Sequence, residues 1–119
     1  MVTISADVTL LTHDRSPMVG YRAAGQSVMG CKYDAIRIGD NSFIGTRAVL
    51  LQGTNIGKNC IVGAGAIVKG NFPDNSIIAG NPARIVGDTL EWHKRKSEDL
   101  EELGKIKFEV EPKIILEEP

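Results

Sequence analysis

The 119-residue sequence has little of what most proteins use to build a broad core or a membrane anchor. Aromatic residues make up only 5% of it, so a core based on aromatic packing is not expected. Its apolar runs are short, as at Ile77–Gly80, and none is long enough to span a bilayer. The N-terminus lacks the basic and apolar segments of a secretion signal. Two cysteines do not make a disulfide framework in a chain of this length, and we expect a cytoplasmic protein.

Excess charge of one sign is also absent from the chain as a whole, whose net charge is −1. The two parts differ, however, because residues 97–119 carry eight acidic side chains against three lysines, a net charge of −5. Residues 1–96 therefore carry +4, which favours an anionic ligand on this part of the chain. The acidic tail argues against a nucleic-acid surface along the chain, so we expect neither a nucleic-acid partner nor a membrane partner.

What the sequence does contain is a repeat of six residues. Every sixth residue is a branched aliphatic at Ile38, Ile44, Leu50, Ile56, Val62 and Val68. The next position is glycine in four of these six repeats, and the position four residues after the aliphatic is nearly always small. A helix would repeat its apolar face every 3.6 residues, so this pattern is not that of an amphipathic helix.

The repeat predicts a three-sided coil of short parallel strands. Each hexapeptide supplies one strand and one corner, with the aliphatic side chain inside and glycine allowing a crowded or positive-φ backbone at the corner. Three sides close a turn of 18 residues, so that residues 18 apart stack and the backbone is satisfied between successive coils. The expected stacked pairs are Ile38 with Ile56, Ile44 with Val62, and Leu50 with Val68.

The regular pattern is interrupted by an excursion loop over residues 14–35. A loop this long within a regular coil is more often functional than idle. The repeat ends after Pro82, and we expect one coil domain over residues 1–87. Residues 88–119 are expected to form a C-terminal helix and an acidic tail.

The C-terminal part has the signals of a helix followed by a short strand. Asp88 is a suitable N-cap for a helix from about Thr89 to Leu103, which Gly104 would end. Residues 105–111 alternate between apolar and polar side chains, which predicts one short strand.

Four motifs give the chain a resemblance to a known family. They are "LLTHD" before the excursion, the coils "IGDNSFIG" and "IVGAGAIV", and the closing "PDNSIIAGNPARIV". Over roughly residues 2–86 the chain resembles the hexapeptide-repeat acyltransferases, most closely the maltose and galactoside O-acetyltransferase branch. The resemblance implies an all-β fold, a left-handed parallel β-helix, followed here by the C-terminal α-helix. It also implies a homotrimer with active sites between neighbouring subunits.

The same resemblance implies that an acetyl group is transferred from acetyl-CoA to a hydroxyl of a sugar or nucleotide-sugar acceptor, with no metal required. The family's catalytic histidine stands just before the excursion, where this chain has His13. As general base, His13 would take the proton of the acceptor hydroxyl while that oxygen attacks the thioester carbonyl. An imidazole suits this role because it exchanges protons near neutral pH. Asp14 has two possible roles, orienting His13 or capping the loop. Because adjacent residues of a strand point to opposite faces, the loop cap is favoured.

Three positions match the family's contacts around the coenzyme arm. Thr46 stands where the family touches the pantetheine arm, and Ala64 matches a residue whose backbone bonds to the same arm. Phe43 stands in place of a common tryptophan beside the coenzyme and the acceptor. Phe43 also belongs to a row of apolar residues that precede the inward aliphatics and should point outward, which indicates a subunit interface.

Three further positions match contacts near the nucleotide end of the coenzyme. Lys69 and Gly70 stand where the family usually has Thr–Lys. Arg84 matches a basic residue near the nucleotide phosphates, and its guanidinium suits bidentate phosphate contacts.

Two other classes of protein use such a coil. A zinc carbonic anhydrase needs three histidine ligands. Because the sequence has only two histidines, this class of enzyme is nearly excluded. A non-catalytic scaffold or a degenerate acyltransferase-like subunit stays open as the alternative. The reason is that relatives usually carry further coils and a helical segment before the catalytic histidine, whereas twelve residues precede His13. A shortened enzyme, a completing partner and a degenerate copy would each explain this.

Overall fold

The computed structural model describes residues 1–27, 32–102 and 114. Most of its strands are only two residues long, as a repeat of one strand and one corner requires. In chain order the elements are β1 (Thr3–Ile4), β2 (Thr9–Leu10), β3 (His13–Asp14), α1 (Pro17–Ala23), β4 (Lys32–Tyr33), β5 (Arg37–Ile38), β6 (Phe43–Ile44), β7 (Val49–Leu50), β8 (Asn55–Ile56), β9 (Ile61–Val62), β10 (Ile67–Val68), β11 (Asn71–Phe72), β12 (Ser76–Gly80), β13 (Ala83–Asp88) and α2 (Thr89–Glu102).

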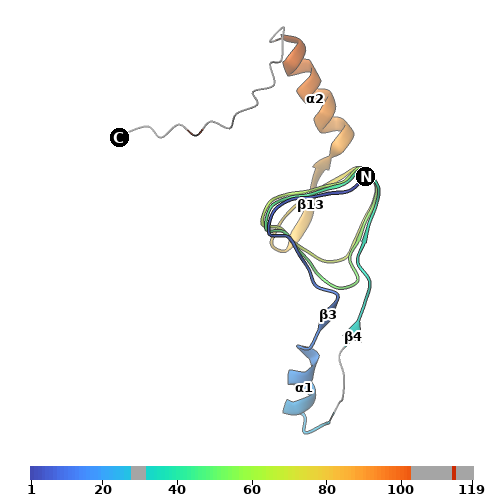
Figure 1. Cartoon of the computed structure of the whole chain (residues 1–119), viewed down its shortest axis with the longest axis vertical. Helices are drawn as coiled ribbons and strands as arrows, with labels where there is room; N and C mark the ends of the chain where they lie inside the picture. Colours follow the sequence, from blue (N-terminus) through green and yellow to red (C-terminus); the bar gives the residue numbers. More distant parts are fainter. Residues whose placement is uncertain (28–31, 103–113, 115–119) are drawn as a thin grey trace, which may run out of the picture.

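The strands stack in parallel on three sides, and Figure 1 shows the coils superposed as a triangle. The sheets are β1-β6-β9-β12-β13, β10-β7-β2 and β11-β8-β5. The three predicted stacked pairs are confirmed as register partners: Ile38 with Ile56, Ile44 with Val62, and Leu50 with Val68. The three-sided parallel coil predicted from the repeat is therefore present.

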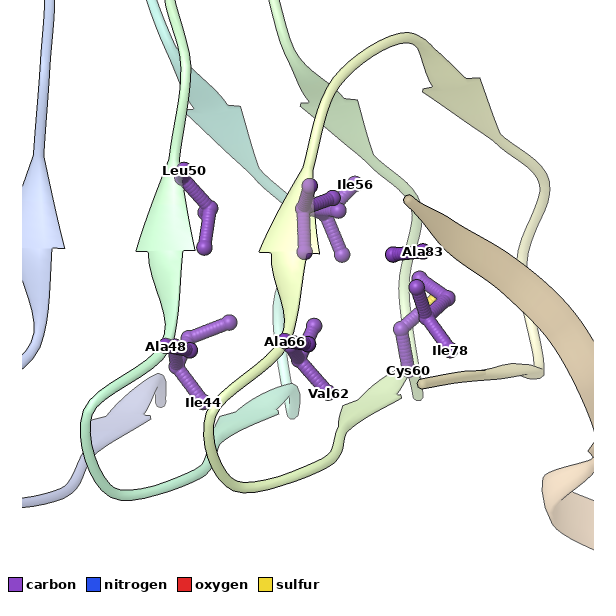
Figure 2. Packing of buried hydrophobic residues seen from close by; sticks show 10 residues of the cluster. Ile44, Ala48, Leu50, Ile56, Cys60, Val62, Ala66, Ile78 and Ala83 are labelled. Carbon is purple, nitrogen blue, oxygen red and sulfur yellow. The ribbon is translucent and has the colours of Figure 1, made fainter. Parts of the chain in front are cut away.

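The core is a narrow column of aliphatic and small side chains inside the coils (Figure 2). Ile44, Leu50 and Val62 are fully buried, as are the small residues Ala48 and Ala66. Two polar side chains also fit at the small positions because backbone carbonyl oxygens accept hydrogen bonds from their hydroxyl groups. Thr54 Oγ1 donates to the carbonyl oxygen of Leu51 at 2.6 Å, and Ser42 Oγ donates to that of Gly57 at 2.9 Å. Such a column has no room for many aromatic rings, which agrees with the composition.

Two kinds of position make the corners. Glycine directly after the inward aliphatic lies against the next coil: a Cβ added to Gly39 would come within 2.4 Å of the carbonyl carbon of Gly57. The left-handed backbone occurs two residues further on, at Asn41, Arg47, Gly53, Asn59 and Gly65, which all have positive φ. The glycines that directly follow the inward aliphatics thus reflect close approach of backbones rather than left-handed φ angles.

The excursion, for which the sequence predicts only a loop, forms structure of its own. β3 pairs with β4 in antiparallel register, with His13 opposite Tyr33 and Asp14 opposite Lys32. Between these strands lies the helix α1, none of whose residues is buried. Figure 1 shows α1 extending away from the triangle on β3 and β4. The coil therefore carries an arm whose base is at His13.

At the other end of the chain the parallel stacking gives way to a hairpin and a helix. β12 pairs with β9 in parallel and with β13 in antiparallel register. The predicted cap is confirmed, because Asp88 Oδ1 accepts hydrogen bonds from the backbone N–H groups of Leu90 (2.9 Å) and Glu91 (3.1 Å). The strand predicted over residues 105–111 lies outside the described residues. Within the described residues, neither helix has the length and apolarity that a membrane crossing requires.

Candidate functional site

A pocket of about 160 Å³ lies where the arm joins the coil. Its walls come from the chain that enters the arm and from one corner of the second and third coils. The lining residues are Leu11, His13, Asp14, Leu51, Gln52 and Lys69. Leu51 and Lys69 are brought together because they follow β7 and β10, which are paired in register. The pocket lining therefore combines an imidazole, a carboxylate, an amide and an ammonium group with two leucine side chains.

His13 reaches this pocket from β3 with its side chain exposed. Its ring lies beside that of Tyr33, with ring centroids 5.5 Å apart and planes tilted by 33°. Tyr33 is its register partner on β4, so the same strand pairing that builds the arm also sets the surroundings of the imidazole. An exposed imidazole of this kind can meet a ligand and exchange a proton with it.

Asp14 is engaged with the turn into α1. Its Oδ1 accepts a hydrogen bond from the Ser16 N–H at 2.8 Å, and its Oδ2 accepts one from Ser16 Oγ at 2.6 Å. These two bonds hold the pKa of the Asp14 carboxyl below its ordinary value, with smaller contributions from the positive charges of Lys69 and His13. The carboxylate acts as a loop cap, as the sequence predicts.

Lys69 lies beside His13 rather than with the predicted phosphate contact Arg84. The next residue, Gly70, has a φ of 115°, and its carbonyl oxygen accepts a hydrogen bond from the N–H of Asn55. The turn at Gly70 thus follows immediately after the residue that lines the pocket. The structure brings together His13 and Lys69, which 55 intervening residues separate in the sequence.

Gln52 is a pocket residue that the sequence analysis did not identify. Its side-chain oxygen Oε1 is buried and has no hydrogen-bond partner among the described residues. The sequence gives only a polar residue at a corner, a position that is usually solvated. The burial of that one oxygen is a tertiary effect, which no local pattern in the sequence encodes.

The other predicted coenzyme positions lie elsewhere on the coil. Thr46 and Ala64 occupy the corner that precedes β7 and β10, whereas the pocket lies at the corner that follows them. Thr46 Oγ1 is 2.8 Å from Ser5 Oγ, and its carbonyl oxygen accepts a hydrogen bond from the N–H of Gly65. One column of side chains and backbone groups therefore runs along this corner.

Arg84 and Phe43 are on the same side of the molecule as that corner. Arg84 on β13 pairs with Ala79 on β12, and Ala79 lies against Gly63, the residue before Ala64. Phe43 on β6 is 42% exposed, as expected for the outward position. The predicted residues thus form two groups at opposite ends of β7 and β10. The first group is His13 and Lys69, which line the pocket, with Gly70 next to Lys69 in the chain. The second group is Phe43, Thr46, Ala64 and Arg84.

The described residues contain no cluster of three or more histidine, cysteine, aspartate or glutamate side chains that could hold a metal ion. The pocket instead offers groups suited to proton exchange and to an anionic ligand. Cys60 is a buried free thiol within the core, and so it is not available to a ligand in this pocket.

Comparison with known proteins places the repeat segment among acyltransferases. A protein-family model described as "hexapeptide repeat of succinyl-transferase" matches residues 35–69. A probable acetyltransferase of Mycobacterium tuberculosis is 39% identical over 67 residues, covering 56% of this chain and 22% of the relative. A 2,3,4,5-tetrahydropyridine-2,6-dicarboxylate N-acetyltransferase of Clostridium perfringens is 41% identical over 68 residues, covering 57% of this chain and 29% of the relative.

Solved structures agree with this result. A maltose O-acetyltransferase from Clostridium difficile superposes with a TM-score of 0.62 and 30% identity, over 73% of this chain and 44% of that one. A galactoside acetyltransferase in complex with coenzyme A gives a TM-score of 0.60 and 30% identity, over 79% of this chain and 48% of that one. The chain spans less than half the length of each of these four relatives.

Proposed function

Because this chain belongs to the hexapeptide-repeat acyltransferase family, we propose that it transfers an acetyl group from acetyl-CoA to a hydroxyl of a sugar-like acceptor. The observation that carries the proposal is the shared pocket of His13 and Lys69 at the base of the arm. Maltose and galactoside acetyltransferases among the structural neighbours support a sugar acceptor, and the coenzyme A complex supports the donor. With the family we also propose a left-handed coil over residues 1–87, a separate C-terminal part and a cytoplasmic location.

In this proposal acetyl-CoA supplies an activated acetyl thioester, and His13 moves the protons. The imidazole takes the proton of the acceptor hydroxyl as that oxygen forms a bond to the thioester carbonyl carbon. When the carbon–sulfur bond breaks, the protonated imidazole returns the proton to the departing sulfur. His13 is neutral again at the end of the reaction, so one residue serves as base and then as acid.

The two groups of residues favour a site shared between copies of the chain. One copy would contribute His13, Lys69 and Gly70, and the next copy would contribute Phe43, Thr46, Ala64 and Arg84. A coenzyme lying in the groove between the copies would contact both groups, whereas a single copy presents them at opposite ends of β7 and β10. Because a head-to-tail interface closes into a ring when its rotation permits, we propose a homotrimer.

The experiment that tests this proposal measures thiol release from acetyl-CoA with a panel of methyl hexopyranosides. We expect His13→Ala to lower acceptor-dependent turnover by about 10²–10⁴-fold, because general-base catalysis contributes about that much. His93→Ala changes an exposed histidine on α2 and should leave turnover unchanged. Calorimetric titration with coenzyme A should show binding to the wild type and to both variants.

Full turnover by His13→Ala would refute the role of this imidazole. Absence of coenzyme A binding at millimolar concentration would favour the alternative, a β-helical scaffold without catalysis or a degenerate acyltransferase-like subunit. The exposed aliphatic side chains of the first coil, Ile4 at 49% and Leu10 at 43%, are the feature of the structure that suits a scaffold subunit.

A further inference from the structure

His13 and Tyr33 lie side by side at the base of the arm. They are register partners on β3 and β4, and partners in an antiparallel pair project their side chains to the same face. Their ring centroids are 5.5 Å apart and the ring planes are tilted by 33°. Aromatic pairs prefer contacts with centroids about 4.5–7 Å apart, so the two rings are in attractive contact.

Tyr33 contacts the imidazole without taking part in the pocket. His13 is a lining residue, whereas Tyr33 is not among the residues that line this pocket. Its side chain is 70% exposed, and its ring lies against that of His13. A ligand in the pocket can therefore reach the imidazole while the tyrosine ring supports it. Tyr33 is placed to act on His13 rather than on the ligand.

Both strands that carry these rings are anchored to the same corner of the coil. On the β3 side, the N–H of Leu11 donates a hydrogen bond to the carbonyl oxygen of Leu50 at 2.9 Å. On the β4 side, the N–H of Gly53 donates one to the carbonyl oxygen of Ala35 at 3.2 Å. Tyr33 precedes this second anchor by two residues. Its backbone is therefore held on the coil beside the pocket, which makes its ring a fixed support.

The carboxylate next to His13 is engaged elsewhere. A carboxylate often orients a catalytic imidazole, but both oxygens of Asp14 accept hydrogen bonds from Ser16. An exposed histidine side chain can turn about its χ angles, and a general base must stay within hydrogen-bond reach of the proton that it takes. A ring packed against the imidazole restricts this rotation, and the contact with Tyr33 does so here.

We propose that Tyr33 is a positioning residue, which holds the His13 imidazole in the orientation that meets the acceptor hydroxyl. This inference rests on the proposed function and adds a residue to it. The contact joins the two rings, so the positioning role requires the aromatic ring and not the phenolic hydroxyl.

The test compares Tyr33→Leu with Tyr33→Phe, which keeps the ring. The substrate is the methyl hexopyranoside that the wild type acetylates fastest. We expect Tyr33→Leu to lower kcat by about 3–10-fold, the change that corresponds to the energy of an aromatic pair. The KM values for acetyl-CoA and the glycoside should stay within about twofold, and Tyr33→Phe should keep the wild-type kcat. Tyr21→Leu is the matched control, because it removes an exposed tyrosine ring from α1, and it should also keep the wild-type kcat.

Proton NMR tests the contact itself without any substrate. The chain has two histidines, so the ring C–H signals of His13 and His93 can be followed separately. An aromatic ring shifts the signals of nuclei beside it. Tyr33→Leu should therefore move the His13 signals and leave those of His93, whereas Tyr33→Phe should leave both near their wild-type positions. His13 signals that do not move in Tyr33→Leu would overturn the proposal.

Three kinetic results would overturn the proposal as well. Wild-type kcat in Tyr33→Leu would show that the ring is not needed. A raised KM with unchanged kcat would assign Tyr33 to substrate binding, and an equal loss in Tyr21→Leu would assign the effect to folding of the arm. If the wild type acetylates no glycoside at all, the proposed function fails together with this inference. An active wild type with an equally active Tyr33→Leu overturns this inference alone.

Discussion

Ile4 and Ile44 are register partners in neighbouring coils, yet Ile4 is 49% exposed and Ile44 is completely buried. Both occupy the inward position of the same column, which continues through Val62 and Ile78. The difference arises because β1 is at the edge of its sheet, whereas β6 has a coil on either side. Burial in this fold thus depends on the neighbouring coils and not only on the position within the repeat.

This relationship predicts unequal costs for the same substitution. Ile44→Ala should lower the free energy of unfolding by about 2–5 kcal/mol, since it removes a fully buried aliphatic side chain and leaves a cavity. Ile4→Ala should cost less than about half of that, because much of its surface is already in water. Urea denaturation of the three proteins measures both values. Equal losses would mean that the first coil is covered in solution, for instance by another subunit.

The corner glycines give a second prediction. A Cβ added at Gly39 would lie 2.4 Å from the carbonyl carbon of Gly57 and 2.6 Å from the backbone nitrogen of Lys58. Gly39→Ala should therefore lower the unfolding free energy by about 1–3 kcal/mol or prevent folding, because backbone atoms cannot yield as a side chain can. Gly20→Ala is the control, since an added Cβ there meets nothing within 4 Å. Thermal unfolding of Gly39→Ala at the wild-type temperature would contradict the close packing of the coils.

The loop cap at Asp14 predicts a pH-dependent effect of Ser16. The pKa of Asp14 is lowered from 3.8 chiefly by the hydrogen bonds from Ser16, so these bonds favour the ionised carboxylate. Their stabilising effect is present above pH 3.8 and is lost as the pH falls through the lower pKa of the folded state. Carbon-13 NMR titration should show the Asp14 pKa rising in Ser16→Ala, though not fully, since the backbone N–H still donates.

The control for this titration is Ser97→Ala, which changes a serine that contacts His93 on α2. It should leave the Asp14 titration unchanged. An Asp14 pKa that is the same in Ser16→Ala and the wild type would show that the cap does not form.

Much of the fold could be predicted from the sequence because the six-residue repeat indicates which side chains point inward and which residues stack on the next coil. The spacing of Ile44 and Val62 gives both the inward position and the parallel register, and the structure confirms it. Asp88 likewise predicts the start of α2, because an N-cap acts on backbone N–H groups only two or three residues away. The helix α1 was not predicted, because seven residues with none buried give no periodic pattern to detect. The sequence also does not tell which corner residues allow close approach of backbones and which have a positive φ. The contact between Gly39 and Gly57 in the structure separates these two roles.

The site was less accessible to sequence reasoning. His13 could be picked out because it stands just before the excursion, but its neighbour Lys69 was predicted on family grounds at the other end of the coenzyme. Their meeting depends on how the arm leaves the coil and on the pairing of β7 with β10. Gln52 could not be predicted as a pocket residue, because nothing in the local sequence indicates that its side-chain oxygen is buried.

The proposed active site is shared between copies, with His13 on one side and Arg84 on the other. The most direct test mixes two inactive variants, His13→Ala and Arg84→Glu, after dissociating and reassembling the oligomers together. Each site made from one intact histidine and one intact arginine should be active, so the mixture should recover about a quarter of wild-type turnover, as random pairing of two copies across one interface predicts. If the mixture stays as inactive as its components, the site lies within one chain and the account is wrong.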